Sequence, residues 1–262
     1  MAVKWDELDS TIQNRFMMDG LIETWNLGII EDSNKAEPLH YTEGIIQLAL
    51  SLTARYECGH YGAIDTWLYL ALHKYPIKDL DVCIIGSADQ GSGPWYEAMV
   101  LNMGGNPITI DYNKVIYDNP RIKFMNVETV RQHIDEGYKF DCLLSVSSIE
   151  HDGLGRYGDP INPDADLETM DLMRSYIKPN GLFFLTVPVG KDRLVYNTHR
   201  IYGSHRLPKL LEKWSVLDTF GYDEKLLNRD ARGNWNPKKS DGTPMFKWYP
   251  AYEPLFVLQN KK

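Results

Sequence analysis

The sequence predicts an α/β fold whose centre is a mostly parallel sheet. Apolar segments recur along the chain, each followed by turn or polar residues, at the spacing of strand–helix–strand units. Several segments are apolar throughout, which is typical of strands covered on both faces. The 262 residues are 43% hydrophobic, so the chain can bury a substantial core. We therefore predict a single domain over residues 1–262.

Residues 1–76 have a helical pattern. Apolar residues recur at helical spacing across residues 45–52, with Ile45, Leu48, Ala49 and Leu52 on the apolar face, and again across residues 64–72. A proline then ends the second predicted helix, because the residue before proline disfavours helical backbone. We expect this segment to form an N-terminal helical cap.

The predicted core spans residues 77–262, and its first strand, 82–85, ends in a turn of small residues. The run from Asp81 to Gly93 reads DVCIIGSADQGSG. Glycine lets backbone approach a ligand closely, and the amide groups at the start of the next helix are free to bind it. Trp95 follows just after this turn. The expected cofactor contacts are Gly86, Ser87, Ala88, Asp89, Gln90 and Gly91.

The second predicted strand, 108–110, ends in an acid. Asp111 lies about 20 residues past the first turn, where Rossmann-like domains bind ribose hydroxyls. One carboxylate offers two oxygens, which match two hydroxyl groups. We expect Asp111, Tyr112 and Asn113 to contact the cofactor, and a short third strand to follow at 122–125.

The fourth predicted strand, 142–146, is followed by polar residues at the carboxyl edge of the sheet, where open α/β folds bind ligands. Ser147 and Ser148 are expected on the cofactor. His151 is a candidate general base, because imidazole titrates near working pH. Its alternative role is to fix the loop through hydrogen bonds.

A fifth strand, 182–187, follows a helix that the Lys-Pro-Asn-Gly sequence is expected to stop. Beyond it, the segment YNTHR carries His199, the second candidate base. In the earlier loop GLGRYGDP, Arg156 lies beside Tyr157, and an arginine beside a tyrosine suits the recognition of a phosphorylated or glycosidic acceptor. Two further strands, 216–219 and 255–258, flank an insertion at 221–253 that we expect near the mouth of the site. The expected substrate contacts are Glu150, Asp152, Arg156, Tyr157, Asp159 and Arg200.

This ordered set of segments resembles the class I S-adenosylmethionine-dependent methyltransferases. The resemblance implies a Rossmann-like sheet with an antiparallel final strand, and S-adenosyl-L-methionine as cofactor. The usual Gly-x-Gly-x-Gly turn is replaced here by Gly86-Ser-Ala-Asp-Gln-Gly91-Ser-Gly93.

Two longer motifs carry a closer resemblance. EHDGLGRYGDP, from Glu150 to Pro160, and PVGKDRLVYNTHRIYG, from Pro188 to Gly203, are similar to a little-characterised domain family of unknown function within that superfamily. Members occur in bacteria and nematodes, several near surface-glycan genes. The resemblance therefore implies a fold and a cofactor, and it hints at a sugar acceptor.

The amino-acid composition limits the kinds of partner that we expect this protein to bind. A net charge of -8 and a pI near 5.4 leave no basic surface for nucleic acid. No apolar run approaches the roughly 20 residues of a membrane span. We expect a cytoplasmic protein that acts on a small molecule or a sugar, that binds neither nucleic acid nor a membrane, and for which an oligomer is possible.

Cysteine and acid spacing predict no metal site. Cys58, Cys83 and Cys142 lack metal-ligand spacing and are expected to be reduced. The acids Asp152, Asp159, Asp164 and Asp166 are of the type that binds hard cations, but acidic loops are usually solvated.

The predicted activity is methyl transfer from S-adenosylmethionine to a small polar acceptor, favouring the oxygen of a sugar or surface-glycan precursor. Holding acceptor and methyl group in line supplies much of the rate enhancement. One alternative is a cofactor-binding or scaffold protein without chemistry. The other is an NAD-dependent oxidoreductase, against which the chain lacks a clean Gly-x-Gly-x-x-Gly and any Tyr-x-x-x-Lys pair.

Overall fold

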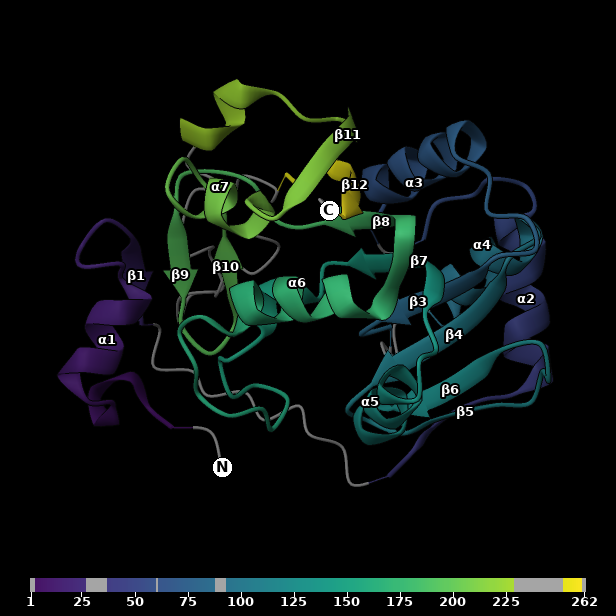
Figure 1. The fold of residues 1–262 in the computed structure, drawn as a ribbon, viewed down its shortest axis with the longest axis horizontal. Coiled ribbons are helices and arrows are strands. Elements are labelled where there is room, and N and C mark those ends of the chain that lie inside the picture. Colours follow the sequence, from purple (N-terminus) through teal and green to yellow (C-terminus); the bar gives the residue numbers. More distant parts are fainter. Residues whose placement is uncertain (1–2, 27–36, 60, 88–92, 229–251, 261–262) are drawn as a thin grey trace, which may run out of the picture.

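A computed structural model of the chain describes residues 3–26, 37–59, 61–87, 93–228 and 252–260. Their main feature is a seven-stranded sheet with the order β11-β12-β8-β7-β3-β4-β6 (Figure 1). The strands β3, β4, β6, β7 and β8 run parallel to one another. They span Asp81–Ile85, Asn106–Asp111, Lys123–Asn126, Phe140–Val146 and Ile177–Thr186.

The last two strands run against the rest. β12, Leu255–Asn260, lies between β8 and β11, Trp214–Phe220, and is antiparallel to both. The predicted fold class, a mostly parallel sheet with an antiparallel final strand, is confirmed.

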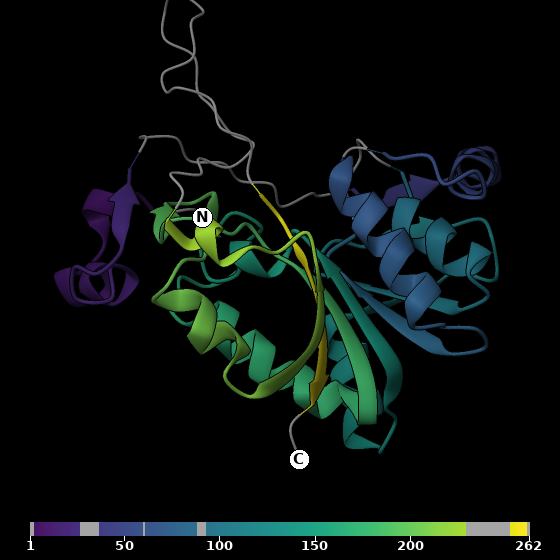
Figure 2. The same cartoon turned by 90° about the horizontal axis from the view of Figure 1, so that it is seen from above.

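Helices cover both faces of the sheet, which explains why its strands are apolar throughout. Along β3, Val82 and Ile84 pack on one side and Cys83 on the other, as the alternation of side chains in a strand requires. Helices α3 and α4 cover the first side, and α5, α6 and α7 cover the second (Figures 1 and 2). These helices span Ala63–Lys74, Trp95–Asn102, Val127–Asp135, Ala165–Tyr176 and Arg206–Leu211.

The first 76 residues contribute more than a helical cap. α3 packs on the sheet itself. α1, Ser10–Phe16, and β1, Glu23–Trp25, lie beside a hairpin of β9 and β10, with β1 pairing with β9 (Figure 1). β2 pairs with β5, and α2 packs against α4. The remaining bounds are β9 Arg193–Val195, β10 His199–Ile201, β2 Leu39–Tyr41, β5 Val115–Tyr117 and α2 Glu43–Thr53.

Two local predictions were wrong. On α2, Ile45 and Leu48 are 43% and 61% exposed, while Ile46 and Ala49 are buried, because the helix turns its 46/49 face toward α4 and the β2–β5 ribbon. The Lys-Pro-Asn-Gly sequence does not separate helix from strand. It lies inside β8, opposite a register shift in β7, and Asn180 takes a φ of 65° there.

Three short 3-10 turns complete the described elements: η1 Trp5–Glu7, η2 Ile149–His151 and η3 Glu224–Asn228. Apart from its first eight and last two residues, the expected insertion at 221–253 lies outside the described residues. None of the helices in the described part of the chain has the length and apolar character needed to cross a membrane.

Candidate functional site

A cavity of about 860 Å³ opens at the carboxyl ends of the parallel strands. The strand order reverses between β3 and β7, and open α/β sheets bind ligands in the crevice at such a point. Residues that follow β3, β4, β7 and β8 all line the cavity. The predicted site residues found in its wall are Gly86, Ser87, Asp111, Tyr112, Asn113, Ser147, Ser148, Glu150, His151, Asp152, Arg156, Tyr157, Asp159 and His199.

The remaining predicted residues are elsewhere. Ala88, Asp89, Gln90 and Gly91 lie outside the described residues. Arg200 is described and does not line the cavity.

The turn after β3 requires glycine at Gly86. Its φ is +67°, and a Cβ there would lie 2.0 Å from Oγ of Ser148. Its amide donates to the carbonyl of Ile110 at 3.0 Å, which joins the ends of β3 and β4. The backbone therefore passes close beside the end of β7 while remaining on the cavity wall.

The Ser87 hydroxyl points into the protein and donates to Glu97 at 2.7 Å. Glu97 is buried and also accepts from Thr109 and Tyr117, at 2.7 and 2.9 Å. Burial raises the pKa of Glu97. We did not predict this residue, although a single acid inside the apolar helix sequence WYEAMVLN was a visible signal.

Asp111 ends β4 and shapes the next turn. Its Oδ1 accepts from the amide of Asn113 at 2.7 Å. Tyr112 between them is 63% exposed at the rim, whereas Asn113 is buried. The acid thus lies on the cavity wall beside the Gly86 turn, since Ile85 and Ile110 are paired in register.

A pair of buried carboxyl groups lies at the end of β7. Ser147 has a φ of 48°, and its hydroxyl donates to Oε1 of Glu150 at 2.6 Å. Glu150 and Glu253 are 1% and 6% exposed, and both line the cavity. In each of them Oε2 is buried without a hydrogen-bond partner among the described residues. Burial raises the pKa of both groups, and for Glu150 the charge of Glu253 adds to the shift.

Both candidate histidines lie at this cavity in a buried state. Nδ1 of His151 contacts the carbonyl oxygen of Thr198, so Nδ1 carries the proton, and Nε2 lies 3.7 Å from Oε1 of Glu150. Nε2 of His199 has no partner among the described residues. Burial lowers the pKa of His151 to about 4 and that of His199 to about 3. Both rings are therefore neutral at pH 7.

Hydrogen bonds to Asp159 hold the loop that follows η2. Asp159 accepts from the amides of Gly155 and Tyr157, both at 3.1 Å. The guanidinium of Arg156 lies 5.4 Å from the centre of the Tyr157 ring, and this ring stands edge-on to His151. Burial raises the pKa of Asp152 to about 7, although the hydrogen bond from Thr169 acts to lower it.

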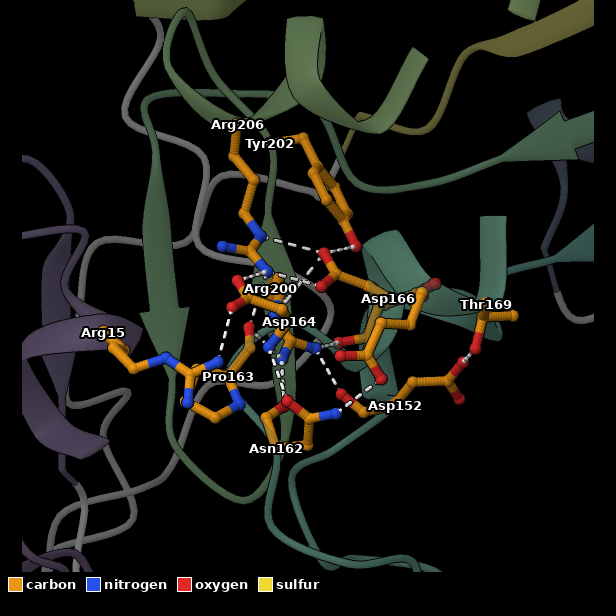
Figure 3. A network of polar contacts seen from close by, with 12 residues as sticks. Arg15, Asp152, Asn162, Pro163, Asp164, Asp166, Thr169, Arg200, Tyr202 and Arg206 are labelled. Atoms are coloured by element: carbon orange, nitrogen blue, oxygen red, sulfur yellow. Dashed lines mark hydrogen bonds and ion pairs between the residues drawn. The ribbon is translucent and has the colours of Figure 1, made fainter. Parts of the chain in front are cut away.

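Arg200 differs from the expectation that it contacts substrate. It is 2% exposed and donates to the backbone carbonyls of Glu150 and Asp152 from behind the cavity wall (Figure 3). Its Nε lies 3.7 Å from the buried Asp166, which also binds Arg206 through two hydrogen bonds. The guanidinium is turned away from the cavity because it offsets the charge of Asp166 and holds the loop.

Several wall residues had no local signal in the sequence. Glu253 lies about a hundred residues after Glu150, beyond the insertion, so only the position of β12 brings them together. Tyr61 and Tyr96 join Trp95 in an aromatic wall, and α6 adds a further side.

One family match covers most of the site. Residues 81–235, more than half of the chain, match the family described as "Caenorhabditis protein of unknown function, DUF268". The chain belongs to this family. No curated protein matches the sequence.

Comparison with solved structures returns methyltransferases among others. MycE from the mycinamycin biosynthetic pathway, in complex with Mg, SAH and mycinamycin VI, is 16% identical, with a TM-score of 0.38 over 52% of this chain. The chain spans 38% of the length of MycE. The N-methyltransferase NodS from Bradyrhizobium japonicum is 13% identical, with a TM-score of 0.42 over 75% of this chain and 93% of NodS. PH0226 from Pyrococcus horikoshii is 14% identical, with a TM-score of 0.46 over 80% and 95%.

Proposed function

We propose that the protein is an S-adenosylmethionine-dependent methyltransferase that acts on a small polar acceptor. The observation that carries the proposal is the pairing of the Gly86 turn with Asp111 at the ends of two neighbouring strands, on one wall of the cavity. Backbone at Gly86 can approach a ligand closely, and the Asp111 carboxylate suits ribose hydroxyls. The cofactor's methyl group would then point toward the end of β7.

The aromatic wall fits a positively charged cofactor. Trp95, Tyr96 and Tyr61 line the cavity next to the strand ends. Aromatic faces attract a cation within about 6 Å of the ring centre, and a sulfonium is such a cation. When bound, the cofactor supplies an activated methyl group. The protein's own residues bind it, orient the acceptor and exclude water.

The acceptor we propose is a sugar or a surface-glycan precursor, methylated on oxygen. The outer part of the cavity carries many hydrogen-bonding groups, which suit a molecule rich in hydroxyls. The residues that would hold it include Asp152, Arg156, Tyr157, Asp159, Glu168 and Thr169.

The cofactor assignment is tested by Gly86→Ala. The added methyl group is strained at a φ of +67° and clashes with Ser148. We expect affinity for S-adenosylhomocysteine to fall by about tenfold or more, equivalent to about 1.4 kcal/mol, in calorimetry. Gly137→Ala is the matched control, since Gly137 has a φ of +96° with nothing within 4 Å of its added Cβ.

Two outcomes would overturn the proposal. Wild-type protein that binds NAD but not S-adenosylhomocysteine would favour the oxidoreductase alternative. Protein that binds S-adenosylhomocysteine equally well with and without Gly86→Ala would remove the turn from the cofactor site. Mass analysis of products on a panel of sugar nucleotides then identifies the acceptor.

A further inference from the structure

Glu150, a predicted substrate contact, forms a buried carboxyl pair with Glu253, for which we predicted no role. Both side chains line the cavity and are nearly inaccessible to solvent. Oε1 of Glu150 accepts a hydrogen bond from the Ser147 hydroxyl, and Ser147 also lies close enough to Glu253 to lower the pKa of that carboxyl. Each carboxyl keeps one buried oxygen without a partner among the described residues. Such an oxygen costs free energy unless a ligand or a proton satisfies it.

The groups around the pair provide little positive charge. Tyr96 faces Glu253 from α4, and Tyr202 faces Glu150 from beyond β10. Asp152 adds negative charge near Glu150. Within the described residues, neither carboxyl forms an ion pair with a lysine or an arginine.

The two histidines and one more arginine complete the surroundings. His151 lies 3.7 Å from Glu150, and His199 packs edge-on against His151. Arg156 acts on both histidines, and it lowers the pKa of each. Arg200 contacts Glu150 only at the backbone carbonyl. The carboxyl pair therefore holds protons at a pH where ordinary glutamates are ionised.

We propose that Glu253, with Glu150 beside it, accepts the proton of the acceptor hydroxyl during methyl transfer. This inference rests on the proposed function. Glu253 takes the proton from oxygen as the new oxygen–carbon bond forms. The electron pair of the broken carbon–sulfur bond stays on the cofactor's sulfur. The protonated carboxyl then releases the proton to solvent as the product leaves.

The histidines are less suited to this step. Nδ1 of His151 is committed to the carbonyl of Thr198, and Nε2 faces Glu150. A base works best when its pKa is near the operating pH. The pKa of each histidine is far below 7, whereas burial raises that of Glu253 to about 7. His151 and His199 are better placed to orient the pair and the acceptor.

The test compares Glu253→Gln with wild type on the methyl acceptor found in the sugar-nucleotide panel. We expect kcat to fall by about 10²- to 10⁴-fold, with affinity for S-adenosylhomocysteine unchanged. In the wild type, kcat should rise with pH through neutrality, and Glu253→Gln should lose this rise. Glu253→Asp should recover part of the activity. Glu128→Gln, an exposed acid on α5, is the matched control and should change neither quantity.

A second measurement needs no acceptor. The carboxyl carbons of ¹³C-labelled glutamate are followed by NMR as the pH is raised in the presence of S-adenosylhomocysteine. We expect a carboxyl that titrates near neutrality and disappears in Glu253→Gln.

The outcomes separate the two proposals. If wild type fails to bind S-adenosylhomocysteine, the proposed function itself is wrong. If wild type binds it and no glutamate titrates near neutrality, the proposed role of the pair is wrong and the function stands. Turnover of Glu253→Gln within about threefold of wild type would also overturn the role of Glu253.

Discussion

Two groups of buried acids lie near the loop that follows β7, and their pKa values are shifted in opposite directions. We call Asp166 with its two arginines the paired cluster, and Glu150 with Glu253 the unpaired cluster. Asp166 is fully buried between Arg200, Arg206 and the hydroxyl of Tyr202 (Figure 3). Burial alone would raise its pKa, but the two arginines hold it below the ordinary value. Glu150 and Glu253 are also buried, with no lysine or arginine paired to either carboxyl among the described residues, and their pKa values are raised.

The difference shows that the neighbour, and not burial, decides what a buried acid does. A carboxylate between two guanidinium groups is permanently charged and serves the fold. A carboxyl without a cation gains and loses protons near neutral pH and is available for chemistry. Arg200 and Arg206 thus lie with Asp166 behind the cavity wall, whereas Glu150 and Glu253 are part of the wall.

The largest effect should come from breaking the paired cluster. Asp166→Asn removes the buried counter-charge that Arg206 and Arg200 share, and it leaves Arg206 only the more distant Asp164, at 3.9 Å. We expect a loss of about 3–5 kcal/mol in the free energy of unfolding, measured with urea. A loss below about 1 kcal/mol would mean that the arginines find other partners, and that the two clusters do not differ as described.

The unpaired cluster should respond with the opposite sign. Between the ordinary glutamate pKa of 4.5 and about 7, the folded protein retains a proton that the unfolded chain has released. Wild-type stability therefore falls as pH rises through this range. Glu253→Gln cannot ionise, so it should be more stable than wild type at pH 8, by about 3 kcal/mol, and equal to it near pH 4.

Urea unfolding at several pH values measures this difference. Glu128→Gln serves as the control, because its carboxyl is exposed. A Glu253→Gln protein that is less stable than wild type at pH 8 would indicate that the ionised carboxylate is stabilised by a partner.

The smallest effect is expected at the edge of the paired cluster. Arg15 binds Asp164 at 2.8 Å, but both side chains are partly exposed, at 53% and 39%. Arg15→Ala should cost at most about 1 kcal/mol, and 1 M salt should remove the difference. A larger, salt-independent loss would show that α1 is held mainly through this contact.

Local sequence was sufficient to predict the framework of the molecule. The strands that became β3, β4, β6, β7, β8, β11 and β12 were all predicted. The inner strands were the easiest to predict, because strands covered on both faces must be apolar along most of their length. The Gly86 turn and Asp111 were found for a similar reason. A turn with a positive φ favours glycine, and an acid directly after an apolar strand can be seen in the sequence.

The shortest strands could not be predicted from the local sequence. β1, β2, β5, β9 and β10 have three residues each, and their pairing depends on distant segments. The helix periodicity at 45–52 predicted α2 but not its buried face, since the face depends on where α4 lies.

The roles of the charged residues were decided by tertiary structure alone. Arg200 and His199 are adjacent in sequence, yet the arginine supports Asp166 and the histidine faces the cavity. Glu253 reaches Ser147 only because β12 runs antiparallel beside β8. A residue's type determines which charges it can carry, and this is written in the sequence. Whether that charge is offset depends on neighbours that the chain brings from a hundred residues away, and only the folded structure determines those.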